Sequence, residues 1–207
     1  MFYLVRFPRW LRWIYPGCIW EMPREGKRLY LTFDDGPHPE VTTFVLDELK
    51  KHDAKASFFC IGKNVAAYPA IYRRIIEEGH AVGNHSFSHM RSLQKNDRAF
   101  MDDIEKARHY IDSDLFRPPY GKINRFQFRL LRSDRFKLRM VMWTVLSGDF
   151  DTSISSEKCL NNVLLHATSG SIVVMHDSEK CKQKIREVLP TVLKKFAENG
   201  YSFDRLY

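Results

Sequence analysis

Short apolar runs alternate along the chain with longer segments in which apolar residues recur every three or four positions. The short runs are rich in β-branched and aromatic residues and are bounded by turn residues, which is typical of buried strands. They cover residues 29–33, 55–61, 80–84, 115–116, 138–143, 171–175 and 201–203. The helical spacing covers residues 39–51, 64–79, 96–111, 124–134, 155–167 and 182–199. Asn64 is expected to cap the second of these helices.

Strands that alternate with helices in this way predict a parallel sheet with right-handed crossovers. Near-continuous apolar strands favour a closed or nearly closed arrangement, so the expected fold class is α/β, a distorted and incomplete (β/α) barrel of about seven parallel strands. A chain of 207 residues is long enough for one such domain with a sizeable core. We expect residues 27–207 to form it and residues 1–26 to form an N-terminal arm.

The arm interleaves aromatic and basic residues, namely Phe2, Tyr3, Phe7, Trp10, Trp13, Tyr15 and Trp20 with Arg6, Arg9 and Arg12. It has no uninterrupted apolar stretch of the kind found in signal peptides or membrane-spanning helices. The expected location is therefore cytoplasmic or peripherally membrane-associated. Two interpretations of the arm remain: it packs over the bottom of the domain, or residues 1–20 lie on a membrane surface.

Charge and cysteine content add little to this picture. Between Arg117 and Arg139 there are eight Lys or Arg residues and one Asp, which indicates either a polyanion-binding patch or a solvated helix face. No zinc-finger spacing or RNA-binding signature accompanies the stretch, so nucleic acid is not an expected partner. The four cysteines show no paired spacing and are expected to be reduced.

Polar residues with catalytic potential follow the predicted strands where each strand ends. Asp34 and Asp35 close the first strand, and His85, Arg117, Asp149 and His176 follow later ones. Because parallel strands present their C-terminal ends at one edge, these side chains are expected to meet there. Gly36 and Pro37 supply the bend that lets two adjacent carboxylates serve one site.

His85 and His89 are spaced so that a helical turn would place both imidazoles on one face. Two histidines and one carboxylate form a site that leaves positions open for water and substrate. We therefore expect Asp35, His85 and His89 to be the ligands of a metal ion. Such an ion would lower the pKa of a bound water and polarise a carbonyl group.

The remaining residues suit acid–base chemistry. Asp34 is placed to act as general base, and Arg117 is expected to hold it through a bidentate pair. His176 is suited to protonate a leaving group, with Asp149 keeping it protonated. Pro118 stiffens the loop that carries Arg117, and a backbone N–H near Tyr120 is placed to stabilise an oxyanion.

These residues lie in five ordered motifs, and together they resemble the polysaccharide deacetylases, the NodB-like metal-dependent esterases of carbohydrate esterase family 4. The motifs are residues 32–37 (TFDDGP), 85–89 (HSFSH), 117–121 (RPPYG), Asp149 and residues 174–177 (VMHD). The resemblance covers about residues 27–203. It implies a distorted β/α barrel and removal of N- or O-acetyl groups from chitin-like oligomers, peptidoglycan or xylan.

The resemblance also implies roles and a cofactor. Asp34 would be the base, Arg117 its partner and His176 the acid tuned by Asp149, whereas Asp35, His85 and His89 would hold a divalent ion. Zinc is the expected ion, with cobalt, nickel or manganese as alternatives. Tyr120 and Pro118 would contact the substrate. Two residues depart from the family pattern, since Phe150 stands where tryptophan is usual and Val174 where leucine is usual; both are expected to line the acetyl pocket.

Two other functions stay open at this stage. One is hydrolysis of a non-peptide C–N bond in a small molecule, which a pocket closed by long loops would favour. The other is a carbohydrate- or membrane-surface binding protein without catalysis, which the complete acid–base set argues against. The mostly short loops favour an open groove and hence a polymeric, acetylated carbohydrate substrate.

Overall fold

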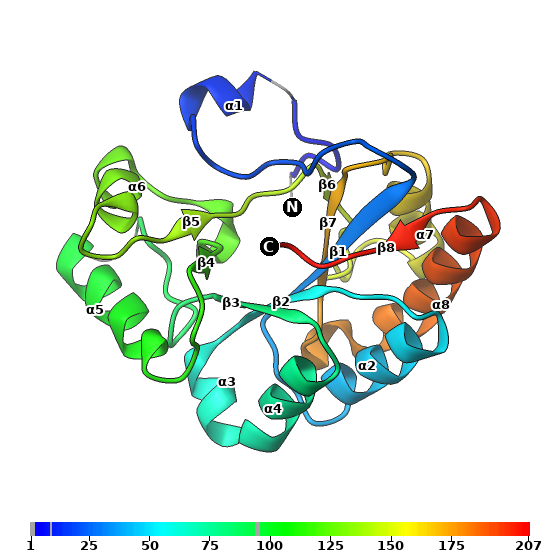
Figure 1. Cartoon of the computed structure of the whole chain (residues 1–207), viewed down its shortest axis with the longest axis horizontal. Coiled ribbons are helices and arrows are strands. Elements are labelled where there is room, and N and C mark those ends of the chain that lie inside the picture. Colours follow the sequence, from blue (N-terminus) through cyan, green and yellow to red (C-terminus); the bar gives the residue numbers. More distant parts are fainter. Residues whose placement is uncertain (1–2, 9, 94–95) are drawn as a thin grey trace.

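Seven parallel strands form a curled half-barrel ringed by helices in the computed structural model, which describes residues 3–8, 10–93 and 96–207 (Figure 1). The strands are β1 (Arg28–Asp34), β2 (Ser57–Cys60), β3 (Ala81–Asn84), β4 (Leu115–Phe116), β5 (Arg139–Met140), β6 (Val145–Leu146) and β7 (Ile172–His176). Their order across the sheet is β5-β4-β3-β2-β1-β7-β6, and a short β8 (Ser202–Phe203) pairs with β1. The predicted fold class is confirmed.

The helices lie on the outside of this half-barrel (Figure 1). They are α1 (Leu11–Ile14), α2 (Val41–Lys51), α3 (Gly62–Ala67), α4 (Pro69–Glu77), α5 (Asp97–Arg108), α6 (Arg125–Arg132), α7 (Ser156–Leu164) and α8 (Lys182–Glu198), with 3-10 turns η1 (Pro119–Gly121) and η2 (Glu179–Cys181). Local sequence explains several starts. At α6, for example, Asn124 and Gln127 form a reciprocal capping box.

Two elements differ from the expectation. The predicted helix over 64–79 is two helices, because the residue before Pro69 is pushed out of the helical region and Tyr68 has φ −128° and ψ 58°. Asn64 is not a cap: α3 begins at Gly62, and the Asn64 amide donates to the carbonyl oxygen of Asp35 instead (2.7 Å). The predicted strand over 138–143 is also shorter, and the unpredicted β6 follows it.

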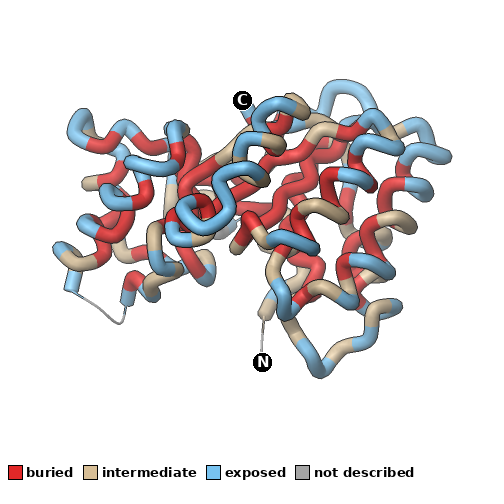
Figure 2. Tube along the Cα trace, turned by 90° about the horizontal axis from the view of Figure 1, so that it is seen from below, coloured by how far each residue is buried: buried red, intermediate tan, exposed pale blue. Residues whose placement is uncertain are grey.

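The core has separate layers on the two faces of the sheet. Alternate residues of β7 point to opposite faces, so Val173 and Met175 pack with the helices whereas Ile172 and Val174 lie in a cluster on the other face. Six of the seven residues of β1 are buried, which explains its continuous apolar run. Figure 2 shows the same pattern, with buried strands at the centre and exposed outer faces on the helices.

The arm packs against the barrel beside β5 and β6. Ile19 bridges Val141, and Arg6 bridges Val145 in antiparallel register, so the arm adds backbone hydrogen bonds at the open edge of the sheet. Trp20 and Met22 are buried in the cluster that contains Val174. The expectation of packing over the bottom of the domain holds for Glu21, which bridges Ser171 just before β7. It is wrong for residues 3–7, which run along β6.

The basic stretch does not form one surface. Arg117 is fully buried, Arg139 pairs with Asp114, and Arg132 donates to a carbonyl of the arm. Within the described residues, no helix combines the length and the apolarity that crossing a membrane requires. All four cysteines are free thiols, as expected.

Candidate active site

The predicted catalytic and metal-binding residues converge at the C-terminal edge of the sheet. Asp34 and His176 are the last residues of β1 and β7 and are register partners. His85 and Arg117 directly follow β3 and β4, and Asp149 follows β6. Each side chain therefore comes from a different strand end, which is the usual construction of an active site in this type of fold.

Asp34 is held by the buried guanidinium of Arg117. Arg117 Nη1 donates to Asp34 Oδ1 (2.6 Å) and to the hydroxyl of Thr32 (2.8 Å). Its Nε and Nη2 donate to the carbonyl oxygens of residues 141 and 142, and its guanidinium lies 4.0 Å over the Phe59 ring. The expected bidentate pair is wrong, because Nε and Nη2 donate to backbone carbonyls and only Nη1 contacts Asp34. The arrangement fixes one oxygen of Asp34 only.

The turn after β1 separates the two aspartates. Asp35 adopts φ +78°, which turns its side chain away from the strand direction. The next residue must be glycine, since a Cβ on Gly36 would collide with the carboxylate of Asp177. Thr42 donates to that carboxylate from α2 (2.5 Å). The backbone conformation at this turn thus directs the side chains of the two adjacent aspartates to different positions.

His85 and His89 lie in an irregular loop and not on a helical turn. Ser86 and His89 have positive φ angles of 64° and 58°. Asp103 of α5 holds the loop by accepting hydrogen bonds from the backbone N–H groups of residues 87 and 88 (3.0 and 3.1 Å). The two imidazoles nevertheless face one another, with ring centroids 5.1 Å apart.

Asp35, His85 and His89 form a set that fits a metal ion. Asp35 Oδ1 lies 3.7 Å from His85 Nε2 and 3.2 Å from His89 Nε2, and this buried oxygen has no hydrogen-bond partner among the described residues. His85 Nδ1 donates to the carbonyl oxygen of Arg117 (2.7 Å), which leaves its Nε2 unprotonated. Burial lowers the pKa of His85 to about 3 and also lowers the pKa of His89. Both rings are therefore neutral at pH 7, the form that binds metals.

His176 and Asp149 form a second pair across the site. His176 Nδ1 donates to Asp149 Oδ1 (2.7 Å), and the other carboxylate oxygen accepts from the His176 backbone N–H (2.6 Å). Burial alone would lower the pKa of His176, but the charge and hydrogen bond of Asp149 outweigh it and raise the pKa to about 10. The imidazole is thus a proton donor at neutral pH.

Cys181 lies beside this pair and completes a second group of potential metal ligands. Its thiol is buried, and burial raises its pKa well above the ordinary range. Because His176 Nδ1 already donates to Asp149 and a protonated thiol is a poor ligand, this group does not suit a metal ion. The set formed by Asp35, His85 and His89 does suit a metal ion.

The residues expected to contact substrate differ in accessibility. Tyr120 is 46% exposed and has φ +61°, with its ring centroid 4.7 Å from that of His89. Phe150 is half-buried and meets the His176 ring edge-on (5.3 Å between centroids). Pro118 and Val174 are buried, and Val174 is only 1% exposed. The substrate contacts of all four stay predictions.

Three supporting residues were not found from the sequence. Thr32 accepts a hydrogen bond from Nη1 of Arg117, the same nitrogen that donates to the predicted catalytic carboxylate. Asp103 holds the histidine loop, and Tyr3 of the arm packs against Phe150 (5.1 Å between ring centroids). Thr32 is a polar residue inside an apolar strand, and Asp103 lies on the apolar side of a helix. Buried polar side chains need hydrogen-bond partners, so both positions could have been recognised from the sequence as supporting residues. The role of Tyr3 could not have been recognised in this way, because its partners are distant in sequence.

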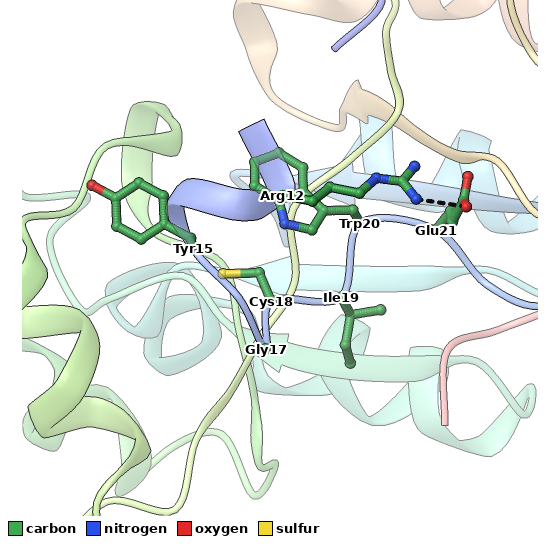
Figure 3. Close-up of a pocket in the computed structure, with 7 residues that line it drawn as sticks. All are labelled: Arg12, Tyr15, Gly17, Cys18, Ile19, Trp20 and Glu21. Carbon is green, nitrogen blue, oxygen red and sulfur yellow. Dashed lines mark hydrogen bonds and ion pairs between the residues drawn. The ribbon is translucent and has the colours of Figure 1, made fainter. Parts of the chain in front are cut away.

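A separate pocket of about 270 Å³ is lined by the arm itself (Figure 3). Its lining comes from residues 12–21, and Arg12 pairs with Glu21 across it (2.6 Å). None of the predicted catalytic or metal-binding residues lines this cavity. We therefore place the chemistry at the strand ends.

The sequence from residue 21 to residue 137 matches the family model described as polysaccharide deacetylase. The chain belongs to the polysaccharide deacetylase family. A peptidoglycan-N-acetylglucosamine deacetylase of Bacillus cereus is 32% identical over 89% of this chain and 88% of its own length. The peptidoglycan-N-acetylmuramic acid deacetylase PdaC of Bacillus subtilis is 34% identical over 84% of this chain, which spans 37% of that longer protein.

Solved structures agree with the family assignment. The peptidoglycan N-acetylglucosamine deacetylase Bc1960 has a TM-score of 0.86 and 29% identity over 97% of this chain and 95% of its own. BA3943 of Bacillus anthracis, a family 4 pseudoenzyme, has a TM-score of 0.79 and 26% identity over 92% of this chain and 68% of its own. Because the family includes a pseudoenzyme, activity in this polysaccharide deacetylase homologue depends on its own side chains.

Proposed function

We propose that the chain is a metal-dependent hydrolase that removes acetyl groups from N-acetylated sugars of peptidoglycan. The observation that carries the proposal is the complete arrangement at one edge of the sheet. A buried carboxylate fixed by Arg117, an unpartnered Asp35 oxygen beside two neutral histidines, and a protonated His176 all face the same region. Relatives that act on peptidoglycan support the substrate class.

Asp35, His85 and His89 would hold the metal ion, and zinc suits a set of two nitrogens and one oxygen. When bound, the ion would polarise the acetamide carbonyl and lower the pKa of the attacking water. Manganese, cobalt and nickel are compatible with the same ligands. The Arg117 carbonyl would orient His85 toward the ion and strengthen it as a ligand.

The two proton-transfer groups have opposite tasks. Asp34 would accept the proton of the attacking water as a C–O bond forms at the acetyl carbon, with Arg117 fixing its other oxygen. His176 would donate its proton to the sugar nitrogen as the C–N bond breaks, and Asp149 would stabilise its charged form. The products are acetate and an amino sugar. Each transfer uses a group whose environment already favours the required protonation state or orientation.

The substrate would lie over the loop of residues 118–121 and along Phe150. Gly121 lets this loop lie directly on Trp143, since a Cβ at this positive-φ position would collide with the indole ring. Tyr120 is 46% exposed and is placed to contact a sugar with the exposed part of its side chain. Phe150 and Val174 would form the apolar wall against the acetyl methyl group.

Acetate release from defined substrates tests the proposal. Zinc-loaded protein is expected to release acetate from peptidoglycan fragments, to lose this activity with a chelator, and to regain it when zinc is returned. Asp34→Asn is expected to fold normally and release about 1000-fold less acetate per second, the scale of a lost general base. The absence of acetate from every acetylated glycan tested with metal-loaded protein would overturn the proposal.

We also propose that the arm contacts a membrane surface through α1. Trp13 is 85% exposed and Trp10 is 54% exposed, and α1 projects from the barrel (Figure 1). Tryptophan favours the membrane–water interface. Co-sedimentation with anionic vesicles, and its loss in the double variant W10A/W13A, would support this contact. Equal sedimentation of the variant and the unaltered protein would refute it.

A further inference from the structure

Arg91 lies beside the metal-ligand set although it is in none of the catalytic motifs. Its guanidinium carbon is 4.6 Å from the centroid of the Tyr120 ring, and the same ring lies 4.7 Å from the ring of His89. One aromatic side chain thus separates the cation from a residue of the metal-ligand set. Arg91 is exposed, so its charge is accessible to a ligand from solvent.

The backbone on both sides of Arg91 is anchored. The N–H of Met90 donates to the hydroxyl of Ser86 (3.3 Å), and the hydroxyl of Ser92 donates to the carbonyl oxygen of Lys122 (2.6 Å). Ser92 is buried. Arg91 is therefore carried by a fixed segment, which reduces the entropy lost when it binds a ligand.

The guanidinium of Arg91 has unused donors. Among the residues that the structure describes, no carboxylate lies within ion-pairing distance of it; Asp34 pairs with Arg117, and Asp35 lies beside the two neutral histidines. A guanidinium stacked on an aromatic face keeps its N–H groups directed sideways. These groups match the two oxygens of a carboxylate.

A second cation flanks the metal-ligand set from another element. Lys63 is exposed in the first turn of α3, and its backbone N–H donates to the carbonyl oxygen of Phe87 in the histidine loop (3.0 Å). The interior of the site is acidic, whereas this part of its rim is basic.

We propose that Arg91 determines specificity by binding a carboxylate of the substrate. The inference rests on the proposed function and names its substrate class: N-acetylated saccharides that carry a carboxylate within about one sugar ring of the acetamido group. The lactyl ether of an N-acetylmuramic acid unit has this chemistry where its carboxyl group carries no peptide. Neutral chitin-like oligomers lack the carboxylate and gain nothing from Arg91.

Two matched substrates test the inference on the unaltered protein. One is a peptidoglycan disaccharide with its lactyl carboxylate free, and the other is the same disaccharide with that group reduced to an alcohol. We expect kcat/KM for acetate release to be about tenfold higher for the acid, the scale of one charge-assisted hydrogen bond, and mainly through a lower KM. Equal values for the two substrates would overturn the inference while leaving the proposed function intact.

Variants then assign the effect to Arg91. R91Q is expected to reduce the acid-to-alcohol ratio of kcat/KM to near one, and R91K to retain part of it. R129Q is the matched control, since Arg129 is an exposed cation on α6 and its loss removes the same net charge. An equal loss with R91Q and R129Q, or an unchanged ratio with R91Q, would refute the assignment. If no substrate releases acetate, the proposed function itself fails.

Discussion

Arg117 hydrogen-bonds to His85 through its backbone carbonyl and to Asp34 through its side chain. The carbonyl oxygen of Arg117 lies 2.7 Å from Nδ1 of His85, and its guanidinium donates to Asp34 over 2.6 Å. A single residue after β4 therefore orients a residue of the metal-ligand set and the proposed general base together. The two roles use different atoms, so they can be separated by substitution.

Arg117→Lys is expected to keep the backbone contact to His85 and lose most of the side-chain contacts. Lysine retains the charge but cannot bond Thr32, Asp34 and two carbonyls in the geometry of the guanidinium. We expect kcat to fall about 100-fold because the base is misplaced, with zinc affinity changed by less than about threefold. Calorimetric zinc titration and acetate release measure the two effects. A parallel loss of zinc would contradict the separation.

Asp34→Asn and Asp35→Asn should have different consequences despite their adjacency. Asp35→Asn removes a charged ligand, and we expect zinc affinity to fall by at least about 100-fold, more than for a residue outside the ligand set. Asp34→Asn should bind zinc normally and lose turnover. Zinc titration of both variants, with thermal unfolding as the control for folding, makes the comparison. Equal loss of zinc in both would show that the assignment is wrong.

Asp149→Asn should move the alkaline limb of the pH–rate profile to lower pH. A general acid works only while protonated, so activity falls as the pH rises through its pKa. In the intact pair Asp149 outweighs burial and raises the pKa of His176 to about 10, which keeps the ring charged at neutral pH. Without that carboxylate, only the charges of Asp35 and Asp34 oppose burial, so the pKa of His176 falls. Measurements of kcat/KM against pH check the shift, and an unmoved alkaline limb would contradict it.

Tyr3→Ala should reduce turnover although Tyr3 contacts no catalytic residue directly. The ring of Tyr3 supports Phe150, whose ring in turn meets His176, so its loss frees the acid to move. We expect kcat to fall about tenfold from this misplacement and stability to fall by about 1 kcal/mol from the lost aromatic pair.

Leu4→Ala is the control for Tyr3→Ala, because Leu4 is 41% exposed on the same segment. Tyr3→Phe should keep most of the activity, since the packing uses the ring. A Tyr3→Ala variant that loses stability but keeps kcat would show that Tyr3 is structural only.

Local sequence patterns were sufficient for most elements and for the position of the site. The strand that ends at Asp34, the helix predicted from Asn124 and the strand that ends at His176 depend on neighbouring residues, and all three match the structure. The helical turn over residues 85–89 was wrong because Asp103, distant in sequence, holds that loop. The spacing of two histidines specifies their proximity but not the backbone between them.

The remaining contacts of Arg117 and those of the arm could not be predicted from the sequence, for a different reason. The sequence indicates that Arg117 and Asp34 pair, but the carbonyls that occupy its other donors come from a segment without regular structure. Tyr3 and Phe150 are 147 positions apart by their residue numbers. Contacts of this kind depend on how the whole barrel closes, and periodicity within one segment carries no information about them.

The arm can form its backbone contacts with the barrel only late in the synthesis of the chain. Val5 and Phe7 hydrogen-bond to residues 146 and 144, and Ile19 bonds to residues 140 and 142. The ribosome therefore releases the arm long before it makes the residues that the arm pairs with. The aromatic arm has none of these partners while the first four of the eight strands are made, and a chaperone or a neighbouring nascent chain has access to it during this interval.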